Sequence, residues 1–84
     1  MKKLKRKTII RQCQSYDIVC LQETHITHET AEIFKREWKG GLYYSAGSNK
    51  SKGQIILINS SFNYKNITVI YQTERILGLN IELN

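Results

Sequence analysis

Residues 16–25 constrain the fold more than any other segment, because they join an apolar run to a cluster of polar side chains. The run Ile-Val-Cys-Leu at positions 18–21 is typical of a strand that is buried on both faces in a sheet covered by helices. Ligands of α/β proteins commonly bind beyond the carboxyl ends of such strands. The segment therefore predicts a buried strand over residues 17–23 that presents polar residues at its end: Gln22, Glu23, Thr24 and His25.

The positive charge of the chain is concentrated at its N-terminal end. The net charge is +6, and residues 1–12 contain six Lys or Arg and no acidic residue, whereas residues 13–84 contain seven basic and seven acidic residues. Such a cluster suits phosphate backbones or anionic surfaces. The simpler alternative, which we favour from the sequence alone, is the solvated face of a helix.

Two helices are predicted in the first half of the chain. Residues 4–15 place Ile9, Ile10 and Cys13 on one side and the basic residues on the other. A second helix follows a cap at Thr24 or Thr27 and ends at Gly40-Gly41. Its apolar stripe consists of Ala31, Phe34 and Trp38, and we expect Phe34 and Trp38 to be core residues.

From Leu42 onward the hydrophobic period becomes that of strands. We expect strands at residues 42–45, 54–59, 67–72 and 75–83, with a polar loop at 46–53. In the last strand, alternate positions form an apolar face: Leu77, Leu79, Ile81 and Leu83. The 84 residues form one small domain or part of one. The predicted fold class is α/β, an α+β sandwich layer of one mixed sheet with two helices and no second sheet.

The cysteines and the hydropathy pattern indicate the expected surroundings. Cys13 and Cys20 do not form a Cys-x-x-Cys pair, and one is expected in a helix and the other in a buried strand. Free thiols in a reducing compartment fit this spacing best. No apolar run reaches the roughly 18 residues of a membrane span. We therefore expect an intracellular protein with no membrane association, with the nucleus as one possible location.

The sequence Asp-Ile-Val-Cys-Leu-Gln-Glu-Thr-His at residues 17–25 resembles the endonuclease/exonuclease/phosphatase superfamily, specifically the apurinic-like endonuclease domain of LINE-type (non-LTR) retrotransposons. The Leu-Gln-Glu-Thr core is characteristic of the superfamily, and the following His25 is similar to the retrotransposon branch. Other features agree in order along the chain: the basic helix at residues 4–10, Trp38 before a glycine, Tyr43-Tyr44, Gly53 before an isoleucine-rich strand, and Arg75-Ile76-Leu77.

The resemblance covers only part of the family's domain. The family pattern begins with a strand that carries a metal-site Asn, and it includes a later Asp-x-Asn pair, an Asp that orients a His, and a final Asp-His pair. Here the only Asp is Asp17, and no His follows His28. We therefore expect residues 1–84 to be an N-terminal portion of such a domain, truncated at both ends and without the family's second sheet.

The resemblance implies roles for individual residues. Glu23 matches the family's metal-coordinating and catalytic glutamate, which binds Mg²⁺ in the intact domain, with weak or no binding expected here. His25, Lys50 and Lys52 are candidate contacts to DNA. A zinc site built on His25 and His28 is the weaker alternative, because no Cys or further His lies nearby.

Two functions follow as expectations. The first is a fragment of a Mg²⁺-dependent DNA endonuclease that nicks target DNA by phosphodiester hydrolysis and is inactive alone. The second is a non-catalytic remnant or basic nucleic-acid-binding module of the same fold. In either case DNA is the expected partner, and self-association is expected through the apolar face of the last strand.

Overall fold

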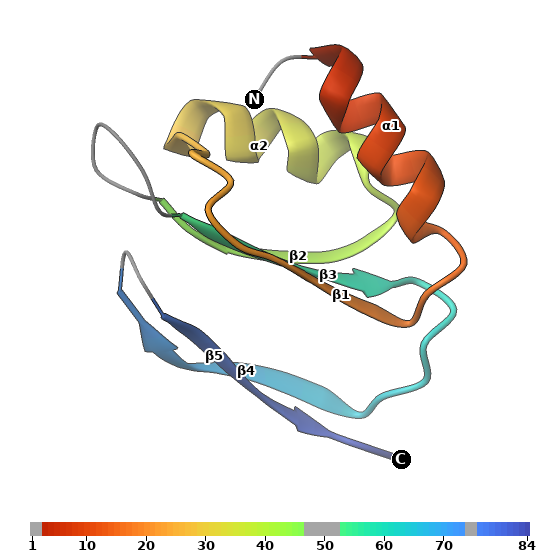
Figure 1. Ribbon diagram of the computed structural model, residues 1–84. Coiled ribbons are helices and arrows are strands. Elements are labelled where there is room, and N and C mark those ends of the chain that lie inside the picture. The colour runs from red at the N-terminus through yellow and green to blue at the C-terminus, as the bar shows by residue number, and fades with distance from the viewer. Residues whose placement is uncertain (1–2, 47–52, 74–75) are drawn as a thin grey trace.

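The computed structural model describes residues 3–46, 53–73 and 76–84. Figure 1 shows three layers, with both helices covering a first sheet and a second sheet packed below it. The elements along the chain are α1 (Lys3–Cys13), β1 (Ile18–Leu21), α2 (His28–Glu37), β2 (Gly40–Ser45), β3 (Gln54–Asn59), β4 (Asn66–Gln72) and β5 (Leu77–Glu82). The mixed α+β class and the two helices are as predicted.

The strands pair differently from the prediction. Instead of one mixed sheet, there is an antiparallel sheet in the order β1-β3-β2 and a separate antiparallel pair, β4-β5. The turn after β3 explains the separation: the Phe62 N–H donates to the carbonyl of Asn59 at 3.0 Å, and the Asn59 Oδ1 accepts from the Ser61 N–H at 3.0 Å. This turn directs the chain out of the first sheet and into a second layer.

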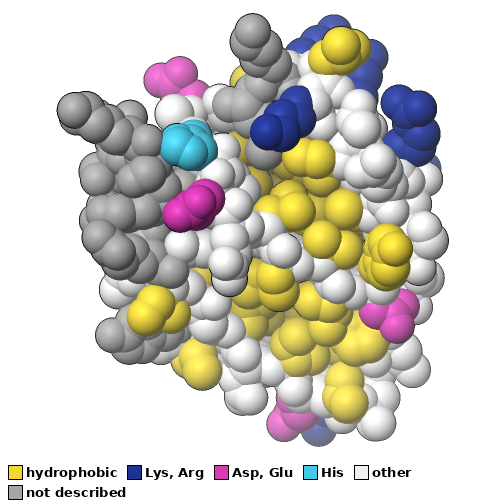
Figure 2. Space-filling model, viewed as in Figure 1, with side chains coloured by type: hydrophobic (Ala, Val, Ile, Leu, Met, Phe, Trp, Pro, Cys, Tyr) yellow, Lys and Arg dark blue, Asp and Glu magenta, His cyan; other side chains and the backbone are white. Residues whose placement is uncertain are grey.

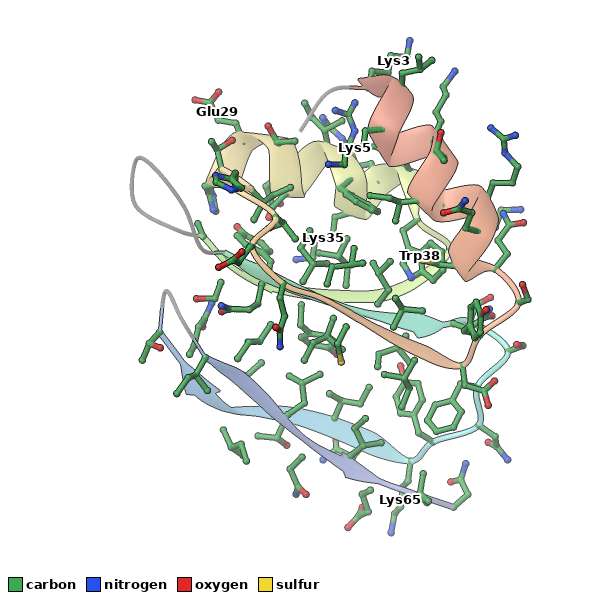
Figure 3. All side chains as sticks on the ribbon, in the orientation of Figure 1. Lys3, Lys5, Glu29, Lys35, Trp38 and Lys65 are labelled. Atoms are coloured by element: carbon green, nitrogen blue, oxygen red, sulfur yellow. The ribbon has the colours of Figure 1, made fainter. Side chains whose placement is uncertain are left out.

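The core lies between the helices and the first sheet. Phe34, Ala31 and Ile55 are fully buried, and the Trp38 Nε1–H donates to the carbonyl of Ile58 at 3.1 Å. Figure 3 places Trp38 in this layer, between the helices and the strands. The apolar stripe of α2 is therefore confirmed. Its cap is Thr27, whose Oγ1 accepts from the Thr30 N–H at 3.1 Å.

Strand β1 is not buried on both faces, contrary to the prediction. Val19 and Leu21 pack against the core, but Ile18 is 39% exposed and Cys20 is also exposed. The reason is position: β1 is an edge strand with a neighbour, β3, on one side only, and the second sheet packs against the first mainly through β3 and β5. Both cysteines are free thiols, as expected, although Cys20 is not a buried strand residue.

The apolar face of β5 is also less exposed than predicted. Leu77, Leu79 and Ile81 are half-buried, and Leu77 lines a cavity with Ile56 of the first sheet. The apolar face of β5 therefore packs against the first sheet. The larger exposed apolar side chains on this half of the chain include Val69, Ile70, Ile76 and Leu83.

Candidate functional site

The turn that follows β1, residues 22–26, has an unusual backbone. Glu23 has φ of 49° and His25 has φ of 54°, and both therefore lie in the left-handed region that disfavours residues with a Cβ. Each such residue costs about 1–2 kcal/mol unless neighbouring structure enforces it. Backbone strain of this kind is concentrated at functional sites in proteins, so the turn is a candidate site.

Thr24 holds the turn in place. Its N–H donates to the carbonyl of Gly53 at 3.0 Å, and its Oγ1–H donates to the same carbonyl at 3.1 Å. The Thr24 Oγ1 also accepts from the N–H of Ile26, whose side chain is 1% exposed. Thr24 therefore does not cap α2, which was one predicted role. It anchors the strained turn between the start of β3 and the core.

The predicted ligand Glu23 and the predicted DNA contact His25 lie on either side of this anchor. Both side chains are exposed, which suits groups that contact a ligand in solution. The turn brings them next to Gly53, the residue that precedes β3. The other predicted contacts, Lys50 and Lys52, lie outside the residues that the structure describes.

A magnesium site needs more oxygen ligands than this turn supplies. Mg²⁺ prefers octahedral coordination by carboxylates, water and substrate oxygens. Within residues 3–46, 53–73 and 76–84, no group of three or more His, Cys, Asp or Glu side chains is arranged to hold a metal ion. The described residues therefore fit one ligand of such a site, Glu23, and not a complete site.

A second polar cluster, which the sequence did not indicate, lies between α2 and β2. The Tyr44 hydroxyl forms a hydrogen bond with His28 Nδ1 and donates to Glu32 Oε2 at 3.2 Å. Burial, followed by the hydrogen bond to Glu32, raises the pKa of Tyr44. These hydrogen bonds tie α2 to β2.

Helix α1 carries an exposed basic surface. The side chains of Lys3, Lys5, Lys7 and Arg11 are exposed, whereas Arg6 is buried. Figure 2 shows Lys and Arg side chains along the upper right of the molecule, above an apolar patch. We name these four side chains the basic surface of α1. It is the largest group of like charges on any single described element.

Comparisons with known proteins add no relative. No family model, curated protein or solved structure matches this chain. Among the described residues, no helix is both long enough and apolar enough to cross a membrane.

Proposed function

We propose that this chain is part of a Mg²⁺-dependent DNA endonuclease of the LINE-type retrotransposon class, in which Glu23 is one metal ligand, and that it does not cleave DNA alone. One structural observation supports the proposal most strongly. The only two positive-φ residues other than glycine among the described residues are Glu23 and His25, inside the motif that carries the family resemblance.

The chemistry explains why a strained turn is useful here. In phosphodiester hydrolysis, a metal ion neutralises the charge that develops on the phosphate. A carboxylate that is fixed before the metal arrives loses less conformational entropy on binding it. The two hydrogen bonds from Thr24 to the Gly53 carbonyl fix the backbone next to Glu23, and so the position from which its exposed side chain extends.

Plasmid nicking in Mg²⁺ tests whether the chain is a nuclease by itself. We expect the purified chain to leave supercoiled plasmid intact at the same level as Glu23→Ala. An exposed acid in the first turn of α2 provides a matched control, Glu29→Ala, which removes a carboxylate outside residues 22–26. Nicking by the native chain and by Glu29→Ala, but not by Glu23→Ala, would show that the chain is a complete enzyme. Nicking by all three proteins would remove Glu23 from the proposal.

Calorimetry with Mg²⁺ tests the ligand more directly. A single carboxylate retains few contacts to the ion, so we expect weak binding, with a dissociation constant in the millimolar range or above, on the order of 4 kcal/mol or less. Tight binding in the micromolar range would contradict a one-ligand site.

The second candidate function is nucleic-acid binding without catalysis, and the basic surface of α1 favours it. Lysines and arginines that neutralise phosphates release counterions, so DNA affinity should fall steeply with salt. We expect replacement of Lys3, Lys5 and Lys7 by Gln to lower the salt slope by about 2–3. Replacement of Lys65, an exposed lysine of the second layer, is the control. An unchanged slope in the triple variant would eliminate this function.

Self-association belongs to the same proposal but now rests on different residues. Since Leu77, Leu79 and Ile81 are half-buried, we assign it to Ile70 and Ile76, which are 64% and 54% exposed. We expect light scattering to show concentration-dependent association that Ile70→Ser weakens. A monomer at all concentrations would contradict it.

A further inference from the structure

A groove lies between α1 and the end of α2. It has a larger part, with a volume of about 440 Å³, and a smaller part of about 270 Å³. Residues that line both parts are Ile10, Gln14 and Glu37. The smaller part extends to the chain after α2 and to the turn after β3, where it is lined by Trp38, Lys39, Asn59 and Ser60. Because the two parts share three residues, they form one continuous groove, which we name the α1–α2 groove.

The α1–α2 groove carries a net positive charge. Lys7, Arg11 and Lys39 line it together with one acid, Glu37. Arg6 already pairs with Glu37 at 2.8 Å, whereas no salt bridge of the three lining cations is found within the described part of the chain. Both helices end beside the groove, and each C-terminal end carries about half a negative charge, so together they offset about one of the three positive charges. The remaining charge favours an anionic ligand.

Only one side of α1 contributes cations to this groove. Lys3, Lys7 and Arg11 are each four residues apart, so they form a row along one side of the helix, with about 6 Å from one residue to the next. Lys5 lies about 200° around the helix axis from Lys7. It is exposed, as Lys7 is, but it lines neither part of the groove. The two lysines therefore distinguish binding in the groove from general attraction to a basic helix.

Asn59 fixes one wall of the groove relative to the other. Its Nδ2–H donates to the carbonyl of Gln14 at 2.8 Å and to that of Tyr16 at 3.1 Å. These bonds join the segment that leaves α1 to the turn after β3. Because the walls are held before a ligand arrives, less conformational entropy is lost on binding. Gln14 and Ser60 are exposed here, and their amide and hydroxyl groups can donate to anionic oxygens.

The groove lies at the opposite end of the first sheet from the turn that contains Glu23. Since β1 and β3 are antiparallel, the end of β3, where Asn59 lies, is beside the start of β1, whereas Glu23 follows the end of β1. Figure 1 shows the C-terminal end of α1 and the turn after β3 at the right, and the turn after β1 at the left. The acid at the start of β1, Asp17, is exposed and lines neither part of the groove. A ligand in the groove is therefore separate from Glu23.

The described lining of the groove offers no aromatic surface to a base. Trp38 is only 6% exposed, and its Nε1–H donates to the Ile58 carbonyl at 3.1 Å. Proteins that bind bases without sequence preference stack them on accessible aromatic side chains. Charged groups and hydrogen-bond donors contact phosphates instead. A nucleic acid carries these charges in its main chain, whereas an acidic peptide carries them on side chains that lose rotamer freedom when they are fixed. The groove therefore suits a phosphate backbone better than an acidic peptide.

We infer that the α1–α2 groove binds the sugar–phosphate backbone of DNA, with Lys7, Arg11 and Lys39 as its cationic contacts and no contact to the bases. The inference rests on the second candidate function, nucleic-acid binding, and gives it a location. That location is one side of α1 together with the chain after α2, and not the whole basic surface of α1. Binding here involves neither Glu23 nor a metal ion, and it does not depend on DNA sequence.

Two matched pairs of lysine variants of the full chain test the location. Lys7→Gln and Lys39→Gln each remove a charge that lines the groove. Lys5→Gln in α1 and Lys35→Gln in the last turn of α2 each remove an exposed charge that does not line it. The readout is the anisotropy of a fluorescein-labelled DNA duplex, measured over a range of salt concentrations. Each groove variant should lower the slope of log K against log salt by about 0.9, and each control should leave it unchanged.

A DNA strand without bases tests the kind of contact. A strand of abasic tetrahydrofuran phosphates should bind within about twofold of oligothymidylate of the same length, because no base is stacked. Its largest amide shifts in the ¹⁵N-labelled chain should lie at residues 7–14, 39 and 59–60. A polyglutamate peptide of equal charge should bind about tenfold more weakly, because its side chains must be ordered.

The outcomes separate this inference from the function on which it rests. Equal slopes within each lysine pair, or amide shifts that map away from the groove, would overturn the groove and leave nucleic-acid binding in place. Binding of oligothymidylate that is tenfold tighter than that of the abasic strand would overturn the backbone contact. Polyglutamate that binds as tightly as the abasic strand would assign the groove to acidic peptides. A chain that binds no DNA would overturn both the inference and the second candidate function.

Discussion

The Nε–H of Arg6 donates to Glu37 Oε1 at 2.8 Å, which joins the first turn of α1 to the last turn of α2. The Arg6 side chain is 8% exposed and that of Glu37 is 28% exposed. One member of the N-terminal basic cluster is therefore part of the helix packing and does not face solvent. The remaining basic side chains of α1, Lys3, Lys5, Lys7 and Arg11, are exposed.

Loss of the carboxylate should destabilise the chain. We expect Glu37→Met to lower the free energy of unfolding by about 1–3 kcal/mol, less than for a fully buried pair because Glu37 is partly solvated. Urea denaturation measures this change. The control is Glu29→Met, an exposed acid in the first turn of α2, for which we expect a loss below about 1 kcal/mol. Equal losses in the two variants would assign the effect to helix charge alone.

The same pair predicts a pH dependence. The hydrogen bond from Arg6 lowers the pKa of Glu37 from its usual 4.5. Because the folded-state pKa is the lower one, the pair stabilises the fold above about pH 4.5, and this stabilisation is lost as pH falls through the folded pKa. Unfolding midpoints between pH 3 and 6 should therefore fall less on acidification in Arg6→Met than in the native chain, with roughly constant stability expected near neutral pH.

The spacing of α1 indicates that Arg6 faces the core side of the helix. Arg6 lies three and four residues before Ile9 and Ile10 and therefore shares their helix face. Local sequence patterns predict several features that are confirmed: the two helices, the cap at Thr27, and the burial of Phe34 and Trp38 in the core. The partner of Arg6 depends on how two helices pack, and no local pattern contains that information.

Sheet topology was the less predictable part of the fold. The run at positions 18–21 is apolar enough for a central strand, yet β1 is at an edge because β3 pairs between β1 and β2. Strand order is a non-local property, so composition alone misassigned Cys20 and Ile18 to a buried environment. Similarly, the sequence predicted Glu23 as a site residue, but the left-handed turn and its Thr24 anchor depend on Gly53, about thirty residues away.

Gly40 should not tolerate a side chain. Its φ is 140°, and a Cβ there would lie 2.1 Å from the Ile58 carbonyl oxygen and 2.9 Å from the Ser60 nitrogen. We expect Gly40→Ala to cost about 3 kcal/mol or more, since both obstacles are backbone atoms. At Gly41 the nearest atom is a ring carbon of Tyr43 at 3.2 Å, which can move. Gly41→Ala should therefore be milder, and similar melting temperatures for both variants would contradict this account of the β2 start.

The turn after β1 predicts a gain in stability from glycine. Glu23→Gly should raise the free energy of unfolding by about 0.5–1 kcal/mol, because glycine adopts φ of 49° without strain and this relief outweighs its greater unfolded-state entropy. Glu23→Ala keeps the strain and should leave stability within about 0.5 kcal/mol of the native value. Thermal unfolding distinguishes the two. A loss of stability in Glu23→Gly would mean that the Glu23 side chain itself supports the fold.

The most direct test of Glu23 as a metal ligand is paramagnetic broadening of the ¹⁵N-labelled chain by Mn²⁺, which substitutes for Mg²⁺ at carboxylate sites. We predict that the first amides to broaden are those of residues 22–26 and Gly53, that Glu23→Gln abolishes this effect, and that Glu29→Gln does not. Broadening that begins at other acids, or that persists unchanged in Glu23→Gln, would contradict the proposed role of this turn.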